Sequence, residues 1–220
     1  PVPTVQCTDL KKKLGKDDYK ISYENNVDAG TATMTITGKG NYQGTFTKDY
    51  TIAPKNLAEP EVKIAPIDAQ EYNGMAVTPA PSVSYEFGDG TYALSPVNDY
   101  TVAYANNKGT GTATVTVTGT GNFTGSKTAE FRIGQLITNE TKFTISCPAL
   151  TDGTQYVYDG SAFEPEVTVT RIEGNKKLVK DSNYSVTYTD NIHAGTATVS
   201  VEGLGGYVGV WQKTFAIAPR

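Results

Sequence analysis

One segment occurs three times in this sequence, and that repetition constrains the fold more than any other feature. The copies cover residues 18–38, 99–119 and 183–203. Each begins with Asp or Asn followed by Tyr-x-[Ile/Val]-x-Tyr and ends, after a short polar stretch, with Gly-Thr-Ala-Thr and a tail that alternates apolar and polar residues. A chain that repeats its own core in this way is interpreted first as an array of similar structural units.

The spacing of equivalent residues sets the repeat boundaries. Tyr19, Tyr100 and Tyr184 are separated by 81 and then 84 positions. The same two intervals recur to the end of each repeat, so the three-residue excess of the third copy lies before Tyr184. We predict repeats at residues 1–54, 55–134 and 135–220, each large enough for a small domain with its own core.

The first repeat is expected to be N-terminally truncated. The later repeats carry a Tyr-x-Gly segment, at residues 72–74 and 158–160, that has no counterpart in the first. The openings of the repeats align at Pro3, Pro81 and Pro165. We therefore expect the first repeat to lack one or two strands.

Alternation with a period of two predicts strands throughout. In the second copy Tyr100, Val102 and Tyr104 alternate with Thr and Ala, and the next segment alternates Ala and Val with Thr. Such alternation is typical of antiparallel strands with one buried face. The sequence thus predicts an all-β tandem array of small Ig-like antiparallel β-sandwich modules, with a β-grasp-like module as the alternative. Asn-rich hairpin loops and glycine-bounded corners, such as residues 38–44, separate the strands.

Composition excludes several classes of protein. The net charge of −4 lacks the basic surface that nucleic acids require. No apolar run approaches the ~20 residues of a membrane helix, and neither end carries a signal or anchor motif. Pro1 in place of an initiator Met predicts a piece of a longer protein. We expect no membrane insertion of this fragment.

The catalytic inventory is small. His193, the only histidine, lies in a hairpin loop where the other repeats have Asp28 and Gly109, so it lacks the orienting partner that base catalysis needs. Cys7 and Cys147 occupy different places in the repeat; we interpret them as two buried thiols, since a disulfide would require the array to fold back. The sequence predicts no enzyme, no catalytic residue, no cofactor and no metal site.

The third repeat carries a recognisable set of motifs: Tyr-Asp-Gly at 158–160, Asn-Tyr-Ser-Val-Thr-Tyr at 183–188, Ala-Gly-Thr-Ala-Thr-Val at 194–199 and Thr-Phe-Ala-Ile at 214–217. Together they resemble the Ig-like or YDG-type repeat modules of large Gram-positive, often gut-dwelling, bacterial cell-surface proteins and adhesins. The resemblance implies an extracellular stalk, spacer or adhesive module. At Gly206 the third copy departs from the asparagine of the other two.

Trp211 is the one candidate ligand-binding residue. It replaces Phe46 of the first repeat and Lys127 of the second, and a position that accepts lysine is expected near the surface. Two interpretations stay open: a sugar-stacking or protein-contact residue, or packing against a neighbouring unit or loop. The favoured function is a non-catalytic cell-surface fragment that binds a host protein such as mucin or immunoglobulin. The alternative is a carbohydrate-binding accessory module of a secreted glycoside hydrolase.

Overall fold

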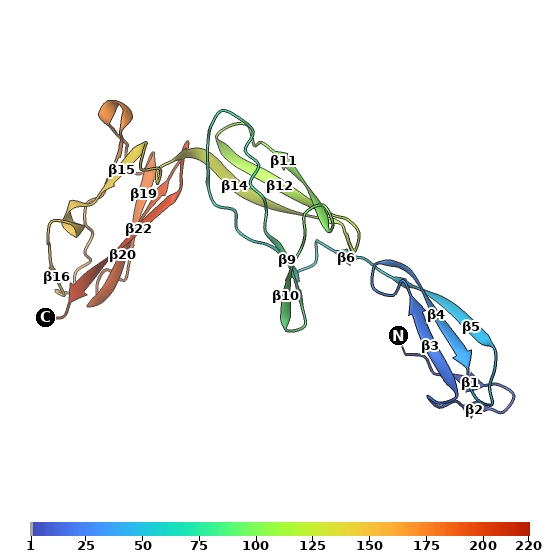
Figure 1. The fold of residues 1–220 in the computed structure, drawn as a ribbon. Helices are drawn as coiled ribbons and strands as arrows, with labels where there is room; N and C mark the ends of the chain where they lie inside the picture. The colour runs from blue at the N-terminus through green and yellow to red at the C-terminus, as the bar shows by residue number, and fades with distance from the viewer. Residues whose placement is uncertain (1) are drawn as a thin grey trace. The chain divides into compact units, whose positions relative to one another are not determined.

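The computed structural model of this chain describes residues 2–220 and is built from β-strands (Figure 1). Two short 3-10 turns, η1 (Pro148–Leu150) and η2 (Glu173–Asn175), are the only helical segments among these residues. The predicted all-β class with antiparallel sandwich modules is confirmed. A β-grasp would need an α-helix packed on its sheet, and residues 2–220 form none.

The chain divides into two compact units. The first comprises residues 1–63, 85–101 and 117–127, and the second comprises residues 64–84, 102–116 and 128–220. The second repeat contributes residues to both units. The sequence junctions at residues 54–55 and 134–135 each lie inside one unit, so the contacts at each junction belong to a single unit.

Each repeat forms one antiparallel meander of long strands. The first consists of β3 (Tyr19–Glu24), β4 (Gly30–Gly38) and β5 (Thr45–Ile52), and the third of β19 (Tyr184–Thr189), β20 (Gly195–Gly203) and β22 (Val210–Ala218). Their registers are the same: Ile21 lies opposite Ile36, and Val186 opposite Val201. The second repeat has β11 (Tyr100–Ala105), β12 (Gly111–Gly119) and β14 (Ser126–Leu136) in the same order.

Special backbone conformations explain the polar residues between these strands. Asn25, Asn106 and Asp190 have φ of 51°, 56° and 55°, the left-handed region that Asn and Asp tolerate best. At the corners a Cβ on Gly119 would lie 2.6 Å from the backbone N of Thr124, and a Cβ on Gly203 would meet Val208 equally closely. Only glycine fits there, because the corner loop folds directly over it.

The third repeat is a two-layered sandwich. One sheet has the order β16-β22-β20-β19, with β16 at Tyr156–Val157, and the other has the order β15-β17-β18. The second sheet comprises β15 (Phe143–Ser146), β17 (Thr168–Arg171) and β18 (Lys176–Lys177). Both sheets contribute to one core, which includes Phe143 and Val169 from one layer and Val199 and Phe215 from the other. This arrangement is the predicted antiparallel sandwich.

Tyrosine hydroxyls connect the sandwich to the chain that leads into it. Tyr188 donates a hydrogen bond of 2.6 Å to the carbonyl oxygen of Pro165, and burial raises the pKa of Tyr188 to about 12. The equivalent Tyr104 donates to Pro79, at 2.7 Å. Pro165 therefore corresponds to Pro79, and the sequence alignment of Pro165 with Pro81 is wrong by two residues. The second repeat has prolines at both 79 and 81, and the Pro-x-Val pattern of residues 165–167 matches the second of them, at residues 81–83.

The second repeat has a smaller additional sheet of order β10-β9-β7, formed by β7 (Val62–Ile64), β9 (Val83–Phe87) and β10 (Gly90–Ala93). A short strand, β8 (Gln70–Glu71), runs parallel to β14. At the corresponding place the first repeat has only the two-stranded pair of β1 (Gln6–Cys7) and β2 (Lys12–Lys13).

Candidate functional site: the joints between repeats

The first joint is a parallel backbone bridge between a linker and a corner loop. The linker strand β6 (Lys55–Asn56) pairs with β13 (Phe123–Thr124) of the corner. The Lys55 amide donates to the Asn122 carbonyl at 2.9 Å, and the Leu57 amide donates to the Thr124 carbonyl at 2.8 Å. The linker therefore occupies hydrogen-bonding groups that the corner would otherwise present to solvent.

The second joint repeats this geometry. The end of β14 pairs in parallel with β21 (Tyr207–Val208). The Gln135 amide donates to Gly206 at 2.8 Å, and the Ile137 amide donates to Val208 at 2.9 Å. Gln135 thus takes the place of Lys55, and Ile137 that of Leu57.

Each linker inserts one apolar side chain into the protein interior. Leu57 is fully buried and Ile137 is 1% exposed. Ile137 belongs to the same core cluster as Phe143 and Val201 of the third repeat. We call Leu57 and Ile137 the plug residues, since each lies in a linker and is buried.

The linkers approach the corner glycines closely. A Cβ on Gly125 would lie 2.1 Å from Oδ1 of Asn56, and a Cβ on Gly209 would lie 2.8 Å from Cδ1 of Leu136. Both glycines also have positive φ, 69° and 95°. The last glycine of the corner motif therefore serves both the turn and the approach of the linker.

At the first joint, Asn122 connects the corner to the hairpin loop of the preceding repeat. Its side-chain amide donates to the Asp28 carboxylate at 2.8 Å, and its Oδ1 accepts from the Ala29 amide at 2.6 Å. These bonds use all the functional groups of one asparagine side chain. Gly206 cannot make them, so its departure from the motif changes the joint rather than the corner, whose closing hydrogen bond from Gly203 to Gly209 is kept at 3.0 Å.

A charged cluster adds to the first joint. The ammonium of Lys55 forms ion pairs with Glu59 and, at 3.2 Å, with Glu61, and lies 5.4 Å from the ring centroid of Tyr85. The hydrogen bond to Glu59 raises the pKa of Lys55. Hydrogen bonds from its own backbone amide and from Lys55 lower the pKa of Glu61. Lys127 donates to the carbonyls of Glu59 and Val62, at 3.2 and 2.7 Å.

At the second joint, Arg132 takes over the connecting role. Its guanidinium donates to the carbonyls of Gly203, Gly205 and Tyr207 at 2.9, 3.3 and 3.1 Å, and lies 3.8 Å from the Glu202 carboxylate. The five donors of a guanidinium suit several acceptors in one loop.

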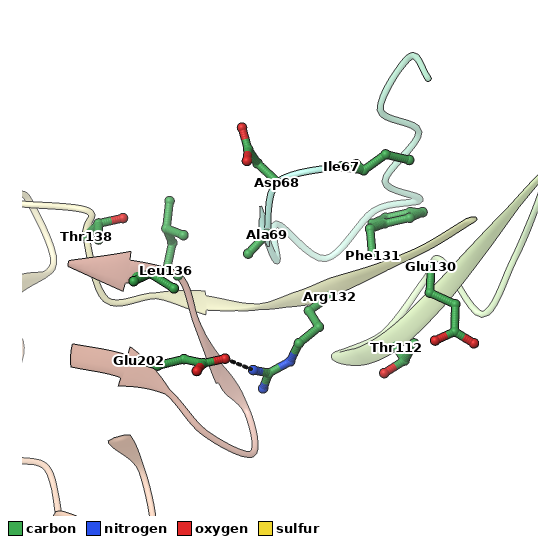
Figure 2. Close-up of a pocket in the computed structure, with 12 residues that line it drawn as sticks. Ile67, Asp68, Ala69, Thr112, Glu130, Phe131, Arg132, Leu136, Thr138 and Glu202 are labelled. Carbon is green, nitrogen blue, oxygen red and sulfur yellow. Dashed lines mark ion pairs between the residues drawn. The ribbon is translucent and has the colours of Figure 1, made fainter. Parts of the chain in front are cut away.

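Figure 2 shows Arg132 reaching from β14 toward Glu202 across a depression, with residues 67–69 on the opposite side. The depression has a volume of about 660 Å³. Near the same joint Lys142 pairs with Glu71 at 2.8 Å. The depression borders the second joint, since Arg132, Leu136 and Glu202 line it.

Trp211, the predicted ligand-binding residue, lies on β22 opposite Val201. It is half-buried and packs against the core of its own repeat. It also lines a shallow depression of about 230 Å³ with Phe143, Glu140 and Thr138. Its role in binding stays a prediction.

The other singled-out side chains are dispersed. The His193 ring stacks on Tyr158 with ring centroids 6.1 Å apart. Both cysteines are free thiols: Cys147 is buried, whereas Cys7 is only partly buried, which departs from the interpretation of two buried thiols. Burial raises the pKa of Cys147. Among residues 2–220 no group of three or more His, Cys, Asp or Glu side chains is placed to hold a metal ion. The same residues include no helix of the length and apolarity needed to cross a membrane.

Sequence reasoning did not identify the joints. The signal was present as Ile-Ala-Pro-Lys-x-Leu at residues 52–57, but proline there indicated only a boundary. Arg132 and Asn122 could not be identified from the repeat pattern, because the contacts that each makes at a joint occur in one repeat only.

Comparisons with known proteins place no family name on the chain. No family model matches the sequence, and no curated protein matches it. Among solved structures, the cis-dimer structure of protocadherin gammaB7 EC3-6 matches with 12% identity, covering all of this chain and 69% of that one. Its TM-score of 0.21 is too low to support any conclusion about function.

Proposed function

We propose that this chain is a non-catalytic fragment of a bacterial cell-surface protein, acting as a stalk that also adheres to a host protein such as mucin or immunoglobulin. The observation that carries the proposal is the joint that occurs twice with the same backbone bridge. A spacer has to connect its repeats by more than a flexible tether, and both linkers here are fixed by two backbone hydrogen bonds and one buried plug residue.

The joints also support the repeat as the unit of the protein. The third repeat includes Ile137 of its linker in its core, as expected of arrays in which each repeat contacts its neighbours. The resemblance of the 158–217 motifs to surface repeats supports an extracellular setting. The adhesive part rests on that resemblance.

Retention of host proteins tests the adhesive role. The full chain would be immobilised and exposed to purified mucin, immunoglobulin and serum, with Trp211→Ala as the matched variant. We expect one host protein to be retained equally by both. Absence of retention by either would contradict the adhesive part and leave a spacer alone.

The alternative function, a carbohydrate-binding accessory module of a secreted glycoside hydrolase, is favoured by one observation. Trp211 lines a shallow depression together with Glu140 and Thr138, and an aromatic ring beside polar groups is the composition of many sugar sites. A glycan array distinguishes the two proposals. Glycan binding that Trp211→Ala abolishes would support this alternative against the adhesive stalk.

A further inference from the structure

Several core positions of the first repeat are only partly buried, although its sequence repeats those of the others and Ala32 and Met34 are buried as their equivalents are. Tyr100 and Tyr184 are 2% and 4% exposed, whereas the equivalent Tyr19 is only partly buried. The same difference separates Ile52 from its buried equivalents Ile133 and Ile217. It also separates Tyr50 from Phe131 and Phe215, and Ile36 from Val117 and Val201.

Segments that precede the meander cover these positions in the third repeat. The plug residue Ile137 and strand β15 contribute to its core, and β16 pairs in parallel with β22 at Ile217. The second repeat has β8 in the same relation to β14, paired at Ile133. Within residues 2–220, β5 pairs only with β4, and β1 only with β2.

The corner loop of the first repeat is open in the same way. A Cβ on Gly44 would meet nothing within 4 Å, whereas one on Gly125 or Gly209 would touch a linker side chain. The corner itself is complete, with the Gly38 amide donating to Gly44 at 3.0 Å. Asn41, the counterpart of Asn122, is exposed, and its side chain forms no hydrogen bond to residues 2–220.

We propose that the first repeat carries a docking site for a linker segment of the type of residues 55–78, delivered by a preceding repeat of the same kind. In that segment a plug residue like Leu57 enters the uncovered core, a strand like β7 pairs with β1, and a strand like β8 pairs with β5. This proposal rests on the proposed stalk function and adds a third joint to it.

The occupant follows from continuity with the two joints that are filled. Each takes the linker directly ahead of it in the chain, in the same parallel register. The spacing also fits. The Val5 carbonyl accepts a hydrogen bond from the Leu14 amide, and the Val169 carbonyl accepts one from the Leu178 amide, both with N···O distances below 3.0 Å. Val5 therefore corresponds to Val83, 78 positions later, and a copy of residues 55–78 would lead directly into Pro1.

An N-terminal extension tests the proposal. A second copy of residues 55–78 would be fused ahead of Pro1 of the full chain. Hydrogen exchange by mass spectrometry would follow residues 38–54, which include the corner loop and β5. We expect exchange there to slow at least about tenfold, because docking converts an open edge into a paired one. The exchange rates in residues 184–218 should not change.

The matched control is the same extension with Leu57→Asp and Val62→Asp in the copied segment, which keeps its length but cannot be buried. Equal exchange with the two extensions would overturn the proposal. So would concentration-dependent protection of residues 38–54 in the unextended chain, since a second copy would then occupy the site. None of these results bears on host-protein retention, which tests the stalk and adhesin separately.

Discussion

The two joints share a backbone and differ in their side chains. In both, two backbone hydrogen bonds join the linker to a corner loop, and one plug residue, Leu57 or Ile137, is buried. The first then relies on Asn122 and a titratable cluster around Lys55, and the second on Arg132 bound to three carbonyls. The glycine corner therefore preserves the docking geometry, while the surrounding contacts vary from joint to joint.

The largest effect is expected from removing a plug. Ile137→Ala should lower the free energy of unfolding of the third repeat by about 2–5 kcal/mol, the usual range for a buried Ile to Ala change. Trp211, the only tryptophan and packed on the same core, reports this in urea unfolding followed by fluorescence. Leu57→Ala is the matched control and should leave the Trp211 transition in place. Equal shifts would show that plugs do not act locally.

The corner glycine comes next. Gly125→Ala should destabilise the first joint by about 1–3 kcal/mol, because the new methyl group displaces Asn56 and the backbone keeps a positive φ. The exchange rate of the Leu57 amide measures the opening. Gly44→Ala carries a similar φ but has open space around it, so it isolates the backbone contribution. An unchanged exchange rate of the Leu57 amide in the Gly125→Ala variant would contradict the close approach of Asn56 to this glycine.

The side-chain contacts should be specific to their own joints. Arg132→Ala is expected to destabilise the second joint by about 1 kcal/mol, since its guanidinium is partly exposed and screened. Asn122→Ala should cost the first joint about 0.5–1.5 kcal/mol. Amide exchange at Gln135 and Lys55, measured by NMR on both variants, separates the effects. Loosening of both joints by either variant would refute their independence.

Acid should weaken the first joint more than the second, and modestly. The pKa of Glu61 is lowered in the folded protein from its ordinary value of 4.5. Ionised Glu61 thus stabilises the folded joint above that ordinary pKa, and this stabilisation is lost as the pH falls through the lower pKa of the folded protein. The carbonyls bound by Arg132 do not titrate in this range. Exchange at Leu57, corrected for intrinsic pH dependence, should accelerate relative to Ile137 below about pH 4.5. A parallel response of both amides would contradict this assignment.

Sequence reasoning predicted the meander because its signal is local and repeated. Alternation at Tyr100, Val102 and Tyr104 predicts a strand without knowledge of its partners, but it does not predict the burial of each residue, because Val102 is exposed. The joints depend on pairs such as Asp28 with Asn122, 94 positions apart, and no local pattern encodes such a pair. Trp211 shows the same limit, because its register opposite Val201 and its packing on the core follow from three strands together.

The plug residues have a consequence for the order in which the chain matures. Ile137 precedes the strands whose interior it completes, so a ribosome releases it before β15 and β20 emerge. Each nascent repeat then closes around a side chain that is already anchored to its finished neighbour. Folding would proceed from the N-terminus, with each plug residue in place before the strands that bury it.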